Sequence, residues 1–193
     1  MLKKIKVILL SAAILLMPVI SNAQPAKNEI GVQYGQFTLL EGVYVLGGVF
    51  GAMFSLGHFN FDNMCALGNF GVGYTRNVNN WFGYGGIACA EYITSDTYTT
   101  DGDGNKTYNG KFNMGAVALM PTATFSWFRN PHFGMYSKIG TGVGVSLSSE
   151  PSVFPAAQVS PVCMEFGGET LKGTFEAGVG MLGIVSLGIK KQF

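Results

Sequence analysis

The chain has 193 residues, with 12 Lys and Arg against 11 Asp and Glu, and only 12% of its residues are charged, about half the share usual in a soluble domain. The basic residues form no cluster of the kind that nucleic-acid binding requires, so we expect no nucleic-acid partner. Beyond residue 23, no apolar stretch reaches the length of a membrane-spanning helix. A chain this apolar without such helices is typical of a closed β-barrel, which satisfies its backbone polar groups internally.

Residues 1–23 are predicted to be a secretory signal peptide. Three lysines precede an apolar run over residues 7–20, and residues 21–23 form a small-residue cleavage site. The apolar run is too short to span a membrane, and no Cys follows the cleavage site to carry a lipid anchor. We therefore expect an exported barrel domain over residues 24–193, located in the cell outer membrane.

The rest of the chain alternates apolar and polar side chains with the period of two that marks strands. Phe70, Val72 and Tyr74 share one face of such a segment, and the other face carries Asn, Gly and Thr. This pattern predicts an all-β fold, an eight-stranded antiparallel up-and-down transmembrane barrel with a filled lumen. The predicted strands are 29–39, 62–76, 81–94, 111–128, 133–147, 156–166, 172–180 and 183–193.

The connections alternate in length, as expected for barrels with short periplasmic turns and longer outer loops. The long connections are 40–61, 95–110 and 148–155, and the short ones are 77–80, 129–132 and 167–171, with a further tight turn at 181–182. Pro121 and Ser160-Pro161 predict bulges or unpaired positions within strands.

Residues 40–61 are nearly all apolar, with scattered glycines. One interpretation is a long extracellular connection that contains a short helix or a hairpin extension. The alternative is a lid or plug over the barrel mouth. Long outer loops are usual in such barrels, which favours the first interpretation.

Charged side chains occur on the inward faces of several predicted strands. The interior of an eight-stranded barrel is only wide enough for side chains to fill, and an unpaired buried charge is costly. We therefore predict an ion-pair network that closes the bore, with a proton relay or a conducting path as the alternative. The predicted network consists of Glu29, Glu91, Glu165, Glu176, Lys138 and Lys190.

No catalytic or cofactor site is expected. The chain has two histidines, of which His132 falls in a short turn and His58 falls in the first long connection, beside Ser55. Two residues do not make a catalytic triad, so we predict no enzyme. We expect a structural or surface-interaction role through the outer loops; a narrow channel or carrier for small apolar molecules, with the first loop as a lid, is the alternative. A lipid-A-modifying enzyme is less favoured.

No metal site is expected either. Residues 101–105, DGDGN, resemble the opening of a calcium loop, but Lys106 and Phe112 stand where that pattern needs Gly and Glu. Cys65 and Cys89 are predicted to face inward on adjacent strands in diagonal register, which disfavours a disulfide. With Cys163, they are expected to be small buried thiols.

Several stretches resemble the small single-domain outer-membrane β-barrel proteins of Bacteroidetes, known as porin-family or outer-membrane β-barrel domain proteins. The resemblance implies an integral outer-membrane protein and supplies no catalytic residues. The matching residues are 71–76, 81, 85–86, 120–122, 125–127, 134–140, 157–168, 175–180 and the closing strand.

The closing strand resembles the signal that barrel-assembly machinery recognises, in the residues Ser186, Gly188 and Phe193. Lys191 departs from this pattern, because an apolar residue is usual at its position, although a lysine at a strand end can reach the interface. This resemblance implies the assembly machinery as a partner. We also expect outer-membrane lipid and an extracellular ligand, which the sequence does not identify, as partners. A secreted soluble barrel of lipocalin type would need an apolar interior and a polar exterior, and residues 133–147 show the reverse.

Overall fold

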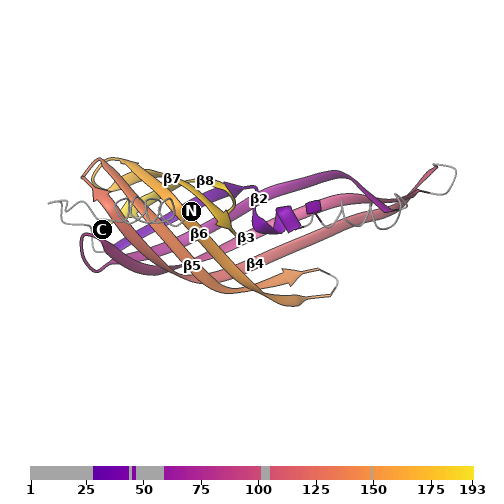
Figure 1. The fold of residues 1–193 in the computed structure, drawn as a ribbon, viewed down its shortest axis with the longest axis horizontal. Coiled ribbons are helices and arrows are strands. Elements are labelled where there is room, and N and C mark those ends of the chain that lie inside the picture. Colours follow the sequence, from indigo (N-terminus) through magenta and orange to yellow (C-terminus); the bar gives the residue numbers. More distant parts are fainter. Residues whose placement is uncertain (1–27, 44, 47–58, 101–104, 149) are drawn as a thin grey trace, which may run out of the picture.

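The computed structural model describes residues 28–43, 45–46, 59–100, 105–148 and 150–193 (Figure 1). Eight antiparallel strands close into a barrel in up-and-down order, and β1 pairs with β8. The predicted all-β fold, an eight-stranded antiparallel up-and-down barrel, is thereby confirmed. The strands are β1 Asn28–Gln36, β2 Phe59–Asn77, β3 Phe82–Thr100, β4 Lys106–Arg129, β5 Phe133–Leu147, β6 Ser152–Gly167, β7 Leu171–Gly180 and β8 Val185–Gln192.

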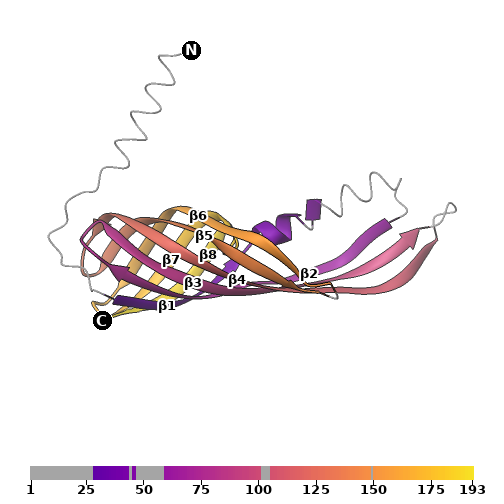
Figure 2. The same cartoon turned by 90° about the horizontal axis from the view of Figure 1, so that it is seen from below.

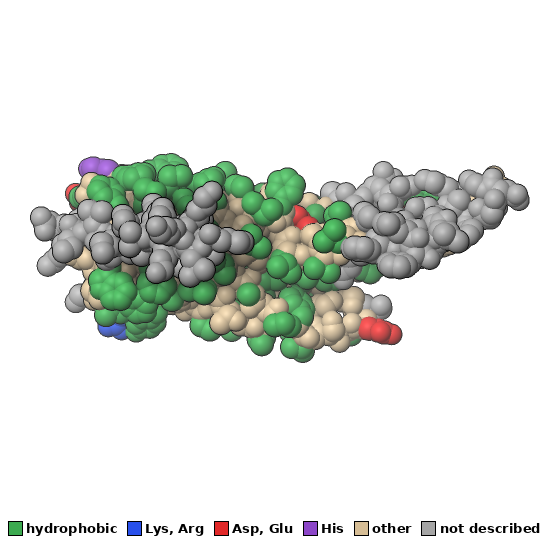
Figure 3. All heavy atoms as spheres, in the orientation of Figure 1, with side chains coloured by type: hydrophobic (Ala, Val, Ile, Leu, Met, Phe, Trp, Pro, Cys, Tyr) green, Lys and Arg blue, Asp and Glu red, His purple; other side chains and the backbone are tan. Residues whose placement is uncertain are grey.

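The outer wall of the barrel is apolar and the bore is largely polar. Val72 of β2 and Leu187 of β8 expose 54% and 59% of their surface, whereas the inward Glu165 exposes 1%. Figure 3 shows hydrophobic side chains over the outside of the barrel. Strand side chains alternate between the two faces of a sheet, so the alternation in the sequence becomes this inside–outside division.

Strands β2, β3 and β4 continue past the barrel as a three-stranded arm, formed by residues 59–68, 93–100 and 106–114 (Figure 2). The prediction of a loop over residues 95–110 is therefore wrong at both ends, because β3 runs to Thr100 and β4 begins at Lys106. The segment is polar on both faces, which hid the strand period, but it is rich in Thr and Tyr, which favour strands. The Tyr98 and Tyr108 rings pack across the arm, with centroids 5.5 Å apart.

A helical segment replaces the end of the first predicted strand. β1 stops at Gln36, Phe37 has a φ of 58°, and residues 39–43 and 45–46 are helical. Thr38 and Glu41 form a capping box, in which each backbone N–H is bonded by the side chain of the other residue. No described helix is long and apolar enough to cross a membrane.

The two proline positions behave differently. The pairing of β6 with β7 shifts register between Val159 and Val162, so the bulge predicted at Ser160-Pro161 is present. Pro121 lies opposite Gly86 of β3 and has no register partner on β5. Since proline has no N–H to donate, an unpaired side is what its position requires.

Candidate functional site within the barrel

An ion-pair network fills the bore near the short turns, at the end opposite the arm. The Lys190 ammonium lies between two carboxylates: it is 2.7 Å from Glu29 Oε2 and also pairs with Glu165. Glu29 Oε1 accepts hydrogen bonds of 2.9 Å from both Asn77 and Gln192. Each of these side chains is buried, and the pairing offsets the cost of removing the charges from water.

Two cations of this network were not predicted. Lys172 Nζ is 2.7 Å from Glu165 Oε1, and Arg129 Nη2 is 3.6 Å from Glu29 Oε1. Arg129 was assigned to a turn, whereas β4 includes it and turns its side chain into the bore. The strand period could have identified Lys172, because it lies four residues before the inward Glu176 on the same strand.

A second branch of the network lies deeper in the bore. Lys138 Nζ donates a 2.6 Å hydrogen bond to Glu176 Oε1, and the Tyr136 hydroxyl donates to the same oxygen at 3.1 Å. A cavity of about 60 Å³ adjoins this branch and is lined by charged, Thr, Gly and apolar residues. A cavity of that size with charged groups in its lining has room for a few water molecules.

An apolar plug closes the bore on the arm side of the ion-pair network. The β7–β8 turn folds inward and buries Met181 and Leu182, and the Gln158 side chain accepts a 2.8 Å hydrogen bond from the Leu182 N–H. A Cβ on Gly35 would lie 1.7 Å from the Leu182 carbonyl oxygen, so only glycine allows this close approach. The plug consists of Ile87, Cys89, Ala118, Met120, Ala156, Met181 and Leu182, with Leu40 and Phe154 packed against it.

A separate polar cluster, here called the mouth cluster, lies on the arm side of the plug. It consists of Thr38, Glu41, Asn69 and Glu91, all buried. The Thr38 hydroxyl donates a 2.5 Å hydrogen bond to Glu91 Oε1 and so joins the start of the helix to the wall of the barrel. The prediction grouped Glu91 with the ion-pair network, but the structure places it here, two residues beyond Cys89 along β3.

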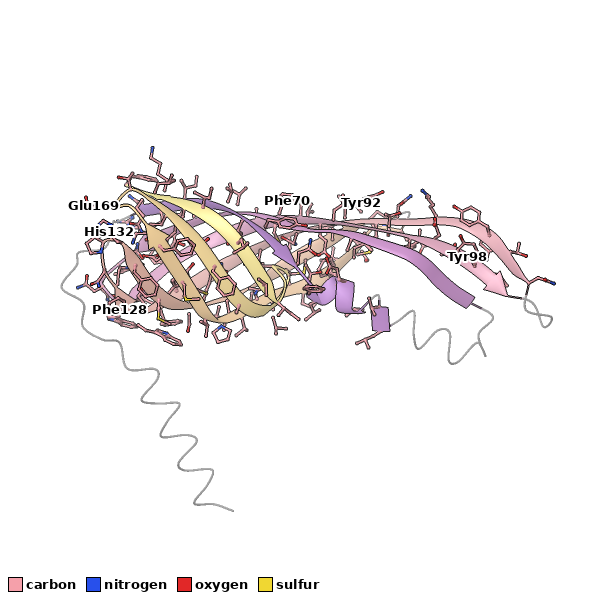
Figure 4. The ribbon with its side chains drawn as sticks, turned by 90° about the horizontal axis from the view of Figure 1, so that it is seen from above. Phe70, Tyr92, Tyr98, Phe128, His132 and Glu169 are labelled. Carbon is pink, nitrogen blue, oxygen red and sulfur yellow. The ribbon has the colours of Figure 1, made fainter. Side chains whose placement is uncertain are left out.

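Among the remaining predicted residues, His132 takes no part in either cluster, and Cys89 adjoins Asn69 of the mouth cluster. His132 is exposed, with Nδ1 3.0 Å from the Gly167 carbonyl oxygen; Figure 4 shows it at the short-turn end, near Phe128 and Glu169. Cys89 and Cys163 are buried free thiols. Cys65 lies opposite Thr94, and Cys89 lies opposite Gly71, so these two cysteines are not cross-strand partners.

Some of the sequence-based interpretations concern residues outside the described part of the chain. These are the signal peptide at residues 1–23, the pair Ser55 and His58, and the calcium-like loop at 101–104. Of the connection predicted at residues 40–61, the structure describes residues 40–43 and 45–46, which are helical as the favoured interpretation expected, and residues 59–61, which begin β2. Leu40 packs against the plug.

The three residues that resemble an assembly signal lie on or beside β8. Ser186 points into the bore and is buried, and Phe193 points outward and is exposed. A Cβ on Gly188 would come within 2.5 Å of the Val32 carbonyl oxygen, so the barrel wall requires glycine there. Lys191 lies on the outer face, opposite Ile30 of β1 and Leu171 of β7.

No family model matches the chain, and no curated protein is significantly similar to it. The three carboxylates of the ion-pair network are each bonded to a cation. Among the described residues, no three His, Cys, Asp or Glu side chains gather to hold a metal. The arrangement closes the bore with paired charges and an apolar plug.

Proposed function

We propose that the protein is an integral outer-membrane β-barrel with a closed bore, and that it acts as a structural or surface-interaction protein. The observation that carries the proposal is the inverted distribution of side chains. Apolar residues cover the outer wall of all eight strands, whereas the described ion pairs lie inside. Lipid would cover this continuous apolar belt, as it does in transmembrane barrels. In a soluble protein the same belt would be exposed to water, which is unfavourable.

The arm supports a role in surface interaction. It extends from the end of the barrel opposite the short turns, which is the outer end in barrels of this architecture. Figure 4 shows Tyr98 along it and Tyr92 near its base; Tyr92 and Tyr108 are exposed, and Tyr98 is half-buried. Exposed tyrosines combine apolar area with a hydrogen-bonding group, and they are frequent in protein interfaces. The extracellular ligand is therefore expected to bind the arm.

The placement is tested by fractionation and electrophoresis. We expect the protein in outer-membrane fractions, with a migration in detergent gels that changes on boiling, because a closed barrel resists unfolding by detergent until it is heated. A soluble protein whose migration boiling leaves unchanged would contradict the proposal. Replacing Phe193 with Ala is expected to reduce the folded fraction in cells, if the assembly machinery recognises β8, while refolding of the purified chain is little affected.

A narrow channel is the second candidate, and the small cavity beside the ion-pair network is the observation that favours it. The cavity lies between the plug and the network, with Ile87 of the plug and Lys190 of the network both in its lining. A continuous path would need both barriers to move. Planar-bilayer recordings distinguish the candidates: the closed barrel gives no stepwise conductance, and reproducible openings would favour the channel.

A further inference from the structure

The acidic side chains inside the barrel are compensated unequally. Glu29, Glu165 and Glu176 each pair with a lysine. Glu91 pairs with no described cation, and the second carboxylate of the mouth cluster, Glu41, has none either. Two buried carboxylates that interact electrostatically with each other would destabilise the mouth if nothing offset their charge.

Thr38 holds the two carboxylates in place from one side. Its N–H donates a 3.1 Å hydrogen bond to Glu41 Oε2, and its hydroxyl donates to Glu91 Oε1. The second oxygen of each carboxylate, Glu41 Oε1 and Glu91 Oε2, is buried and accepts no hydrogen bond of normal geometry, although the Asn69 amide lies beside the Glu91 carboxylate. Each carboxylate is thus fixed through one oxygen and leaves the other available as a ligand.

Asn69 adds a third oxygen at the same place. It lies directly across the β2–β3 ladder from Glu91 and beside its carboxylate, and its side chain is 0% exposed. Its amide group contacts the Glu91 carboxylate and the Cys89 thiol, and its amide oxygen accepts no hydrogen bond. A fully buried amide oxygen without a partner is costly, and a bound cation would supply that partner.

We propose that the mouth cluster binds a divalent hard cation, Ca²⁺, through Glu41, Glu91 and the amide oxygen of Asn69. Calcium takes carboxylate and amide oxygens in flexible geometry and completes its shell with water, whereas Mg²⁺ demands near-ideal octahedral geometry. Two carboxylates match the charge of the ion. Because Glu41 lies on the helical segment and the other two ligands lie in the barrel wall, the ion ties the start of the helix to the wall.

Calorimetric titration tests the proposal. The full chain, refolded in detergent micelles and stripped with a chelator, is titrated with CaCl₂. We expect one saturable site, weakened about tenfold or more in Glu91→Gln and in Glu41→Gln, because affinity for calcium follows the number of ligand charges. The matched control is Glu169→Gln, which removes an exposed carboxylate at the opposite end of the barrel (Figure 4) and should leave binding unchanged.

Two results would overturn the proposal: a wild-type chain that shows no saturable binding of Ca²⁺, and binding that persists unchanged in both variants. The first result would favour a proton shared by the carboxylates, and the second would place the ion elsewhere. Heat-modifiable migration reports whether each variant is folded. If Glu91→Gln does not fold, Glu41→Gln decides the outcome, together with the rise in wild-type unfolding temperature that bound Ca²⁺ produces.

Discussion

The two ends of the bore contain the same kind of acidic side chain in opposite electrostatic situations. Near the short turns, Glu29, Glu165 and Glu176 meet four cations, Arg129, Lys138, Lys172 and Lys190. At the mouth, Glu41 and Glu91 meet none of the described cations, and they are held by Thr38. The plug separates the two groups, so neither can neutralise the other. The comparison suggests that the short-turn end stabilises the barrel and that the mouth is the end equipped to bind something.

The largest effect is expected from Lys190→Met. This change leaves Glu29 and Glu165 with less compensation in a buried site, and breaking a buried pair costs about 3–5 kcal/mol. We expect about 5 kcal/mol, because one lysine serves two carboxylates. Urea titration of the refolded barrel measures the free energy of unfolding. The control is Lys191→Met, one residue away on the outer face, and an equal loss in both variants would contradict the role assigned to the network.

A pair of matched variants, Glu176→Gln and Glu91→Gln, tests the difference between the two ends. In the presence of a chelator, we expect Glu176→Gln to lose about 3 kcal/mol, because Lys138 is left without its carboxylate. Glu91→Gln should be neutral or slightly stabilising, because it removes a charge that no described cation offsets. The same urea titration measures both variants, and losses of similar size would show that the mouth is compensated after all.

Leu182→Ala tests the barrier between the ends. Burial is complete at this position, and truncation of a buried leucine costs about 2–5 kcal/mol. We expect about 2 kcal/mol, the lower end of that range, because a short turn can shift into the space. The variant should still show no stepwise conductance in planar bilayers, because the ion-pair network remains. Openings in this variant would show that the plug alone closes the bore.

The smallest effect is expected from Thr38→Ala. It removes the capping hydroxyl and the hydrogen bond to Glu91, and loss of an N-cap typically costs about 1 kcal/mol. Amide hydrogen exchange should show faster exchange over residues 39–43, with little change in β3. Unchanged exchange in the helical segment would mean that the capping box does not hold it to the wall.

The barrel could be predicted because one physical pattern repeats in every strand. β5 has the predicted bounds, because most residues on one of its faces are apolar and the other face carries mainly Gly and polar residues. The tip of the arm, residues 95–110, could not be identified in this way, because both of its faces are largely polar. The inward turn at Met181 and Leu182 was also hidden, since no periodicity shows which way a short turn folds.

The candidate site was predicted in part. The strand period identified the inward carboxylates and two of the lysines, but it could not show which charges meet, because the pairing depends on tilt and register. Arg129 was missed at a strand end, where the period gives no phase. The pattern Thr38-x-x-Glu41 is a capping box that could have located the start of the helix and with it the mouth cluster.

The central claim is that the apolar outer wall lies in lipid. Ile139, outward on β5 and 48% exposed, is suited to a direct measurement. In a background in which Trp81 and Trp127 are replaced by Phe, an Ile139→Trp variant is refolded into vesicles with bromine-labelled acyl chains. If the outer wall lies in lipid, the bromine atoms quench the tryptophan emission strongly and aqueous iodide does not. Emission quenched by iodide and unaffected by brominated lipid would contradict it.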